Sequence, residues 1–417
     1  VIIVGSGLAW TPVSFLPYGD DTYANWLSHA KQIWLVNDFW FPGMMSAALG
    51  YPPGWHLLLA FSGGFWGSFI EAHALAAPMV FHVALLAMAF DLCRAVLLRR
   101  FELEHRTSTG LALFAILFLL AIEGAWKLMP TLLLSGMPLF YSAIGVILML
   151  AMFWLPGALG WRVALAIGIG TGAHYLLKSQ GLALVPLIVV AVFVATLVTR
   201  ARYGPWLAAA GGLTVLAALP VLVEILSWKI VSPASMKCSL NVGHIFSGSL
   251  AEFGRPGSSW ITIGRDLLAG TGDHLWRYKL PVTILALIGL CWGLTHTYTR
   301  WLCLAVVGYA CIYMIAVYVT YVGCPDGFNA YLSSLTRYLQ LPVRMLHFVG
   351  IWVLIVAVID LGRHLDLDHF RKPAWVGGVA VIALLTLYQL AAVNASFKQM
   401  ASPAIGSRMA QFVSEIP

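Results

Sequence analysis

The stretch WLCLAVVGYACIYMIAVYVTYV (residues 301–322) contains no charged side chain, and it matches the run of ~20 residues that a helix needs to cross a membrane. Apolar runs of similar length recur along the 417 residues. Hydrophobic residues make up 60% of the chain and charged residues 10%, and the mean hydropathy is +0.86. Soluble domains carry about 25% charged residues, so this chain cannot cover a water-exposed surface. The sequence therefore predicts an all-α, polytopic membrane protein.

About eleven membrane spans are expected when the apolar runs are delimited by the short basic loops between them. The first is a partial run at residues 1–16. The segment from Pro52 to Trp66 is too short to cross the membrane, so we expect it to lie at the interface or to re-enter. The other spans are expected at 70–98, 108–128, 132–155, 162–177, 182–199, 206–228, 280–299, 301–322, 341–362 and 374–393.

The basic side chains of the short loops fall on one side of this arrangement, which the positive-inside rule makes the cytoplasmic side. The long polar loops at 17–53, 229–279 and 323–340 fall on the opposite, external side. One membrane domain is therefore expected over residues 1–393. The segment 394–417 is expected to be external and to start a water-facing part. The basic residues are Arg94, Arg99, Arg100, Arg106, Arg200, Arg202, Arg300, Arg363, Arg371 and Lys372.

The net charge of +7 does not indicate nucleic-acid binding, because the basic residues cluster in loops and form no continuous stripe. Of the six cysteines, Cys238 and Cys324 fall in two external loops, where a disulfide between them stays an open alternative. The other four fall in apolar runs and are expected to be small buried hydrophobic residues. The histidines are too scattered to build or exclude a metal site. The high Trp, Ala, Leu and Gly content fits a bacterial inner membrane protein.

An acidic pair, Asp20-Asp21, stands in the first external loop, directly before the stretch TYANWLSHAKQIW (residues 22–34). Apolar and aromatic residues recur in this stretch at three-to-four spacing, which predicts an amphipathic helix at the membrane interface. An acid at this position is also a good N-cap, so capping explains either acid alone. One Asp would be enough for capping, and the second therefore favours a functional role for one of them.

Two further motifs place polar groups near the external side. His56 would point from the first turn of the short helix that opens at Tyr51-Pro52-Pro53, as an interfacial histidine or as a ligand. Lys178 interrupts an apolar stretch at the outward end of a span, and His174 precedes it by one turn. A charge there is costly unless it snorkels or binds an anion such as a lipid phosphate. Lys178, His174 and His56 are therefore candidate substrate-binding residues.

The late stretch YLSSLTRYLQLPVRML (residues 331–346) adds two arginines. Arg337 and Tyr338 stand where a span is entered from the outside, and Arg344 lies two turns further in. Arginine suits bidentate contact with phosphate, so Arg337, Tyr338 and Arg344 are further candidate substrate-binding residues. An arginine inside a lipid-facing helix is costly, so Arg344 is expected to face the protein interior or a cavity. The sequence contains no G-x-S-x-G, paired-Cys zinc spacing, H-E-x-x-H or P-loop motif.

The order of these motifs resembles the GT-C superfamily of membrane glycosyltransferases, particularly the branch of the lipid A aminoarabinose transferase and the protein O-mannosyltransferases. Members carry an acidic pair before a Tyr, a Pro-Pro segment opening a short helix, a Gly-rich helix ending in Leu-x-Lys, and a late Arg-Tyr. The matching segments are Asp20-Asp21-Thr22-Tyr23, Tyr51-Pro52-Pro53 to Phe65-Trp66-Gly67, Gly168 to Lys178 with Val185-Pro186, and Arg337-Tyr338-Leu339 with Pro342. Gly50-Tyr51 stands where the aminoarabinose branch has Glu-Lys, so a divalent metal stays an open alternative and no metal ligand is assigned.

The resemblance implies a GT-C-like fold with external juxtamembrane helices. It also implies an inverting transfer of a sugar from a polyprenyl-phosphate donor to an acceptor hydroxyl of a glycan, lipid or protein at the external membrane face. Asp21 would be the general base that takes the proton from the acceptor, and Asp20 would orient it. The leaving phosphate needs fixed cations, for which Lys178 and Arg337 are the candidates. Tyr23 would line the sugar or an interfacial slot, as would Trp26 and Trp55.

Two other functions stay open at this point. An oligosaccharide ligase or polymerase would use the same cations with a pyrophosphate-linked donor. A lipid or solute transporter would use Lys178 and Arg344 in its substrate pathway and would not depend on Asp20 or Asp21. Transporters usually gather polar residues near mid-membrane, whereas here they gather at the outer rim, which favours the glycosyltransferase.

Overall fold

The computed structural model describes residues 27–37, 54–69, 76–123, 137–153, 161–177, 179–200, 206–231, 242–255, 260–276, 280–324 and 335–364. Within these ranges every regular element is helical, which confirms the all-α prediction for this part of the chain. The helices are α2 (Ser28–Val36), α3 (Gly54–Trp66), α5 (Ala76–Arg100), α6 (His105–Glu123), α8 (Met137–Phe153), α9 (Trp161–Leu177), the 3-10 helix η2 (Ser179–Ala183), α10 (Leu184–Arg200), α11 (Trp206–Val231), α12 (Val242–Phe253), α13 (Trp260–Trp276), α14 (Leu280–Thr295), α15 (Thr297–Gly323) and α17 (Leu335–His364).

Two helices among the described residues are long and apolar enough to cross a membrane, namely Thr299–Gly323 within α15 and Tyr338–Gly362 within α17. Helices α5, α6, α8, α9, α10, α11 and α14 overlap other expected spans, but none of them passes the same test of length and composition. The expected spans at 1–16 and 374–393 lie outside the described residues. The described part of the chain is thus all-helical, with two helices suited to crossing a membrane, and the number of eleven spans stays a prediction.

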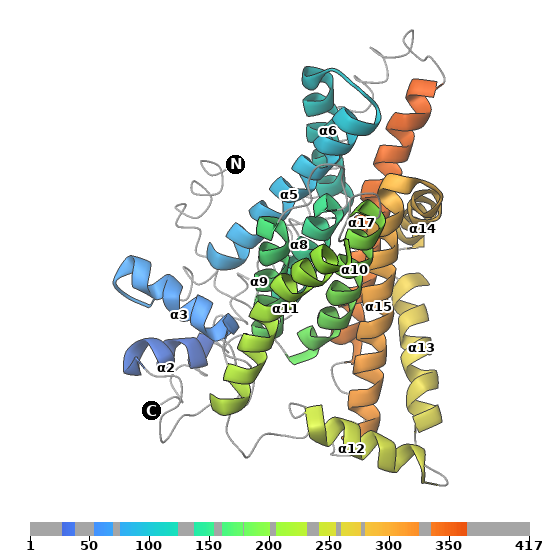
Figure 1. The fold of residues 1–417 in the computed structure, drawn as a ribbon. Coiled ribbons are helices and arrows are strands. Elements are labelled where there is room, and N and C mark those ends of the chain that lie inside the picture. Colours follow the sequence, from blue (N-terminus) through green and yellow to red (C-terminus); the bar gives the residue numbers. More distant parts are fainter. Residues whose placement is uncertain are drawn as a thin grey trace, which may run out of the picture.

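The long helices α15 and α17 pack against each other and against most of the bundle. Helix α17 contacts α14, α13, α8 and α6, and α15 contacts α8, α10, α12 and α14. Figure 1 shows α5, α8, α9 and α11 beside them, with α2 and α3 at the lower left and α12 across the lower end. Helix α3 has 13 residues. Its length is therefore about 20 Å, too short to cross a bilayer, in agreement with the expectation for this segment.

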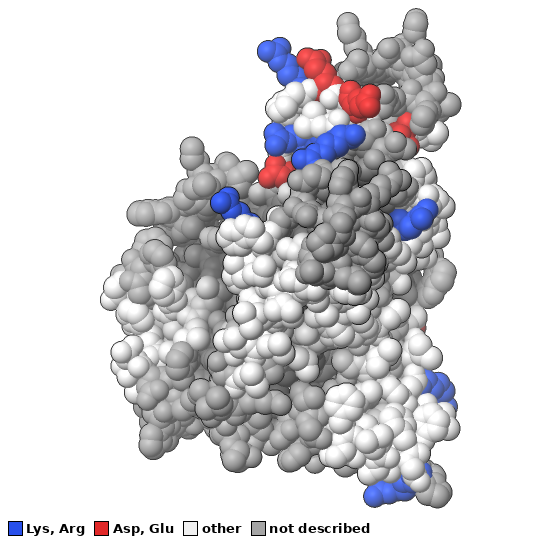
Figure 2. Space-filling model, viewed as in Figure 1, with Lys and Arg blue, Asp and Glu red and all other residues white. Residues whose placement is uncertain are grey.

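Charged side chains of the described residues gather at one end of the bundle. Figure 2 shows Lys, Arg, Asp and Glu concentrated at the upper end, where Figure 1 places the junction of α5 and α6. Arg94 and Arg99 on α5 and Arg106 on α6 belong to the basic loops expected on the cytoplasmic side. The expected external loop at 229–279 contains two helices, α12 and α13, and α13 packs along α15 and α17.

The cysteines differ in part from expectation. Cys93 and Cys303 are buried, but Cys291 and Cys311 are exposed on α14 and α15, so the prediction of burial is wrong for these two. Small apolar side chains are equally compatible with the lipid-facing side of a membrane helix. Cys324 is disulfide-bonded. Its expected partner, Cys238, lies outside the described residues.

Helices α14 and α17 cross at a pair of glycines. A Cβ atom on Gly289 would overlap the carbonyl oxygen of Gly350, and a Cβ on Gly350 would overlap the carbonyl oxygen of Ala286. Small residues let membrane helices approach until their backbones touch, which maximises van der Waals contact where lipid offers no hydrophobic driving force. This crossing fixes the position of α17 and of the residues at its start.

We expect Gly350→Ala to destabilise the protein by about 1–3 kcal/mol, because the added methyl group must push α14 away. The measurement is the apparent melting temperature of the detergent-solubilised protein. Gly110→Ala on α6 is the matched control, since a Cβ there meets no atom within 4 Å. That variant should be neutral or more stable by about 0.5–1 kcal/mol. Equal melting temperatures for the two variants would contradict a close α14–α17 crossing.

Candidate functional site

The structure describes only part of the expected site. Asp20, Asp21, Tyr23 and Lys178 lie outside the described residues, and so does Trp26. Arg337 lies in the first turn of α17, but its side chain is not among those described. The site is therefore built from the helices that flank these residues.

His174 joins three helices near the end of α9. Its side chain is fully buried. The Nδ1 atom lies 2.6 Å from Ser142 Oγ on α8, and Nε2 lies 3.0 Å from the Tyr309 hydroxyl on α15. The Ser142 hydroxyl donates to the Leu139 carbonyl at 3.2 Å. In a neutral imidazole one ring nitrogen donates its proton and the other accepts one, so His174 donates one of these two bonds and accepts the other.

The chain around the end of α9 is tightly held on two sides. A Cβ on Gly181 of η2 would lie 2.5 Å from the His174 carbonyl oxygen, so η2 folds back onto the last turn of α9. A Cβ on Gly54 would lie 2.9 Å from Leu176 Cβ, so the first turn of α3 rests on the same turn. Lys178 falls between α9 and η2 in the sequence, and the elements before and after it are thus fixed by close contacts.

Buried tyrosines continue from His174 along α15. Tyr309, Tyr313 and Tyr321 recur at intervals of four and eight residues and are all buried. The Tyr309 and Tyr313 rings are 5.8 Å apart. Tyr338, in the first turn of α17 and next to Arg337, is buried against Tyr321 with ring centroids 6.3 Å apart and planes at 74°. This row of tyrosines connects the end of α9 to the start of α17.

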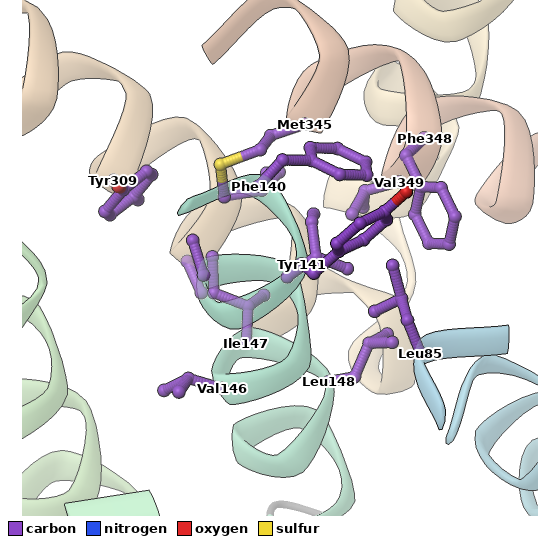
Figure 3. Packing of buried hydrophobic residues seen from close by; sticks show 14 of the residues in the cluster. Leu85, Phe140, Tyr141, Val146, Ile147, Leu148, Tyr309, Met345, Phe348 and Val349 are labelled. Carbon is purple, nitrogen blue, oxygen red and sulfur yellow. The ribbon is translucent and has the colours of Figure 1, made fainter. Parts of the chain in front are cut away.

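Arg344 faces the start of α8, in agreement with the expectation that it is directed toward the protein. It is half-buried, and its Nη2 donates to Gln340 Oε1 at 3.3 Å. Its charge acts on Tyr141 in the second turn of α8. Figure 3 shows Phe140 and Tyr141 of α8 directed toward Met345, Phe348 and Val349 of α17. The start of α8 and α17 are therefore held together by apolar packing.

His56 is fully buried in the first turn of α3 and contacts His29 of α2. The two rings have centroids 4.2 Å apart and planes at 43°. The preceding residue, Trp55, is buried as well and lies 6.5 Å from Phe81 of α5. Among the described residues, no partner accepts a hydrogen bond from Trp55 Nε1. His56 and Trp55 thus attach α3 to its neighbours.

Helix α2 confirms the amphipathic pattern of the stretch that follows the acidic pair. Leu27, Ala30 and Ile33 are buried, as their spacing predicts. His29 is buried with them, although its position in the sequence gave no sign of a partner. Ser142 and Tyr309 were also missed, because both lie inside apolar runs where an isolated hydroxyl carries no signal of its own.

No group of three or more His, Cys, Asp or Glu residues close enough to hold a metal ion occurs within the described ranges. The acidic pair lies outside these ranges, so a divalent metal at the candidate site stays an open alternative.

We expect Ser142→Ala to lower the stability of the protein by about 1–3 kcal/mol, because it leaves a buried ring nitrogen of His174 without its partner. Thermal unfolding of the detergent-solubilised protein measures this loss. Thr109→Ala removes a surface hydroxyl that bonds only the His105 carbonyl of its own helix. It should change stability by no more than about 0.5 kcal/mol. A Ser142→Ala variant as stable as Thr109→Ala would contradict the bond to His174.

No protein-family model and no curated protein sequence matches this chain. The model is similar to a solved structure of the archaeal oligosaccharyltransferase AglB from Archaeoglobus fulgidus in complex with an inhibitory peptide and a dolichol-phosphate. The sequence identity is 13%, the TM-score is 0.46, and the match covers 94% of this chain and 54% of that one. A second structure of the Archaeoglobus fulgidus oligosaccharyltransferase, tethered to an acceptor peptide, matches with 13% identity over the same shares of the two chains and a TM-score of 0.45. The chain thus spans about half the length of these structures, and these structural neighbours are members of the GT-C superfamily.

Proposed function

We propose that this protein is an inverting glycosyltransferase that moves a sugar from a polyprenyl-phosphate donor to an acceptor hydroxyl. The reaction would take place at the external face of a bacterial inner membrane, and the acceptor would be a glycan, a lipid or a protein. The proposal rests on the order of sequence motifs that resembles the GT-C superfamily, together with the packing of the helices that adjoin those motifs.

The observation that carries the proposal is the packing of α2 on α3 and of α3 on α9. In the sequence, α2 follows the acidic pair and α9 precedes Lys178. Helix α2 follows Asp20-Asp21 in the chain and contacts α3, with the His29 and His56 rings in contact. Helix α3 in turn rests on α9 through Gly54 and Leu176, two residues before Lys178. The segment that follows the acids and the segment that precedes the lysine therefore belong to one packed unit.

A second series of contacts leads toward Arg337. His174 bonds Tyr309, and the tyrosines of α15 continue to Tyr338. Arg337 precedes Tyr338 directly. Lys178 and Arg337 thus each stand close, in the sequence, to a residue of this buried series, which supports assigning both to the lipid phosphate. In this arrangement His174, His56 and Tyr338 position the flanking helices, while Lys178 and Arg337 would contact the phosphate.

The chemistry follows from these roles. Asp21 accepts the proton of the acceptor hydroxyl as that oxygen attacks C1 of the sugar. The bond from C1 to the phosphate oxygen breaks, the anomeric centre inverts, and the lipid phosphate leaves with additional negative charge. Lys178 and Arg337 stabilise that developing charge, as fixed cations do most effectively in a site shielded from water. Asp20 orients the acceptor or the base, and Tyr23 lines the sugar.

We expect Asp21→Asn to lower the rate of sugar transfer by roughly 10²–10⁴-fold, because the amide cannot take the proton of the acceptor. The assay follows transfer in detergent from a polyprenyl-phosphate sugar pool, at equal yields of folded protein and with donor binding measured separately. Asp20→Asn should have a smaller effect. Asp91→Asn, at an exposed residue of α5 that pairs with Arg94, is the control and should keep full activity.

If Asp20→Asn and Asp21→Asn both transfer sugar at the wild-type rate, the acidic pair only caps a helix and the proposed chemistry is wrong. If Asp21→Asn instead loses donor binding together with transfer, the acid holds the donor and is not the base.

We expect Lys178→Met and Arg337→Met to weaken donor binding and to lower the rate by about 10²–10³-fold, since each removes a cation from the leaving phosphate. Lys178→Arg should recover part of the activity, because it restores the charge. Lys31→Met, on the exposed face of α2, is the matched control. Full activity of Lys178→Met would show that this lysine only snorkels to the membrane surface.

A further inference from the structure

Helix α12 lies across the end of α15 and touches it backbone to backbone. A Cβ on Gly248 would overlap the Gly323 carbonyl oxygen, and a Cβ on Gly323 would overlap the Ile245 carbonyl oxygen. The Ser249 hydroxyl lies 2.9 Å from the Val319 carbonyl oxygen and 2.7 Å from that of Ile245. Figure 1 shows α12 crossing the lower end of α15. The helix is therefore fixed in place where α15 ends.

One face of α12 carries an apolar stripe of Phe246, Leu250 and Phe253, and the Phe253 ring also packs against Trp260 of α13 and Tyr318 of α15. The side chains of the stripe are 60%, 72% and 43% exposed. Their spacing of four and three residues places them on one face of the helix. Small residues, Ala251 and Gly254, occupy another exposed part of the helix surface. The exposed surface of α12 thus has two parts. One part carries the large apolar side chains of the stripe, and the other carries the small residues.

The position of α12 relative to α15 identifies what covers the stripe. The apolar segment Thr299–Gly323 is long enough to span a membrane, and it ends at the residue on which Gly248 rests. Ile315 on α15 and Ile261 and Leu268 on α13 are also exposed. Figure 2 shows the surface over α12 and α13 as largely uncharged, with basic side chains at its right and lower edges. Arg265 and Asp266 of α13 are exposed and form an ion pair. The stripe therefore continues the lipid-facing surface of the span up to the membrane–water boundary.

We propose that α12 is an interfacial helix whose stripe of Phe246, Leu250 and Phe253 inserts among phospholipid acyl chains on the side of the membrane where α15 ends. Amphipathic helices in this position bury their apolar face at the boundary between headgroups and acyl chains. At the end of α12, Arg255 and Glu252 form an ion pair of 2.7 Å, and the Arg255 side chain is 68% exposed. Its position lets it reach the phosphate layer while the stripe lies below it. This surface is independent of the proposed reaction.

Site-directed photocrosslinking in phospholipid vesicles tests the proposal on the full chain. Benzoylphenylalanine replaces one residue at a time, at positions 246, 250 and 251, and position 315 on α15 gives the yield of lipid adducts within the bilayer. These positions are at the surface, so the replacements leave the core intact, which size-exclusion chromatography verifies. The adducts are identified by mass spectrometry as phospholipid or protein.

Positions 246 and 250 should give phospholipid adducts in a yield comparable to position 315 and several-fold above position 251. Adducts to a second copy of the chain would overturn the proposal in favour of a dimer interface. The absence of lipid adducts at 246 and 250 would overturn it by placing α12 in water, and equally high lipid yields at 250 and 251 would overturn it by surrounding the helix with lipid. The sugar-transfer assay of the wild-type protein is separate, so failure of either proposal leaves the other standing.

Discussion

Direct contact between helix backbones is the constraint on which the rest of this structure depends. Apolar side chains gain little by leaving lipid for one another, so close packing must supply the association energy. Gly289 and Gly350 provide it between α14 and α17, and Gly168 does so against the Ala217 carbonyl oxygen of α11. A single added methyl group at such a crossing would force the two backbones apart where they touch. The crossings therefore fix where the ends of α9 and α17 lie.

Within this packed frame, His174 holds the end of α9, which precedes Lys178, against α8 and α15. Its two ring nitrogens are used by hydroxyls of α8 and α15. In a medium without water the alternative is an unsatisfied polar group, so both bonds resist separation of the three helices. Lys178 follows this helix end in the sequence, and α2, which follows the acidic pair in the sequence, packs on α3, which in turn contacts α9. The geometry of the proposed reaction thus rests on buried residues that need not touch the substrate.

Much of the helical structure could be predicted from the sequence, and less of the site. The apolar runs gave the existence of α9, α15 and α17, and periodicity gave the buried face of α2, except that His29 joins it. Arg344 was expected to face the protein because charge in lipid is expensive, and it does. Ser142 and Tyr309 could not be predicted, since a lone hydroxyl in an apolar run looks the same whether it faces lipid or another helix.

The sequence by itself determined the class of the protein, the approximate helices, the basic side of the bundle and the order of motifs that suggests glycosyl transfer. These properties depend on composition and on the local spacing of residues along one helix. Only the tertiary structure decided that His29 meets His56, that Ser142 and Tyr309 share His174, and that α12 lies across the end of α15. Periodicity defines the face that a helix buries, but the partner of that face is set by where small residues let two backbones approach.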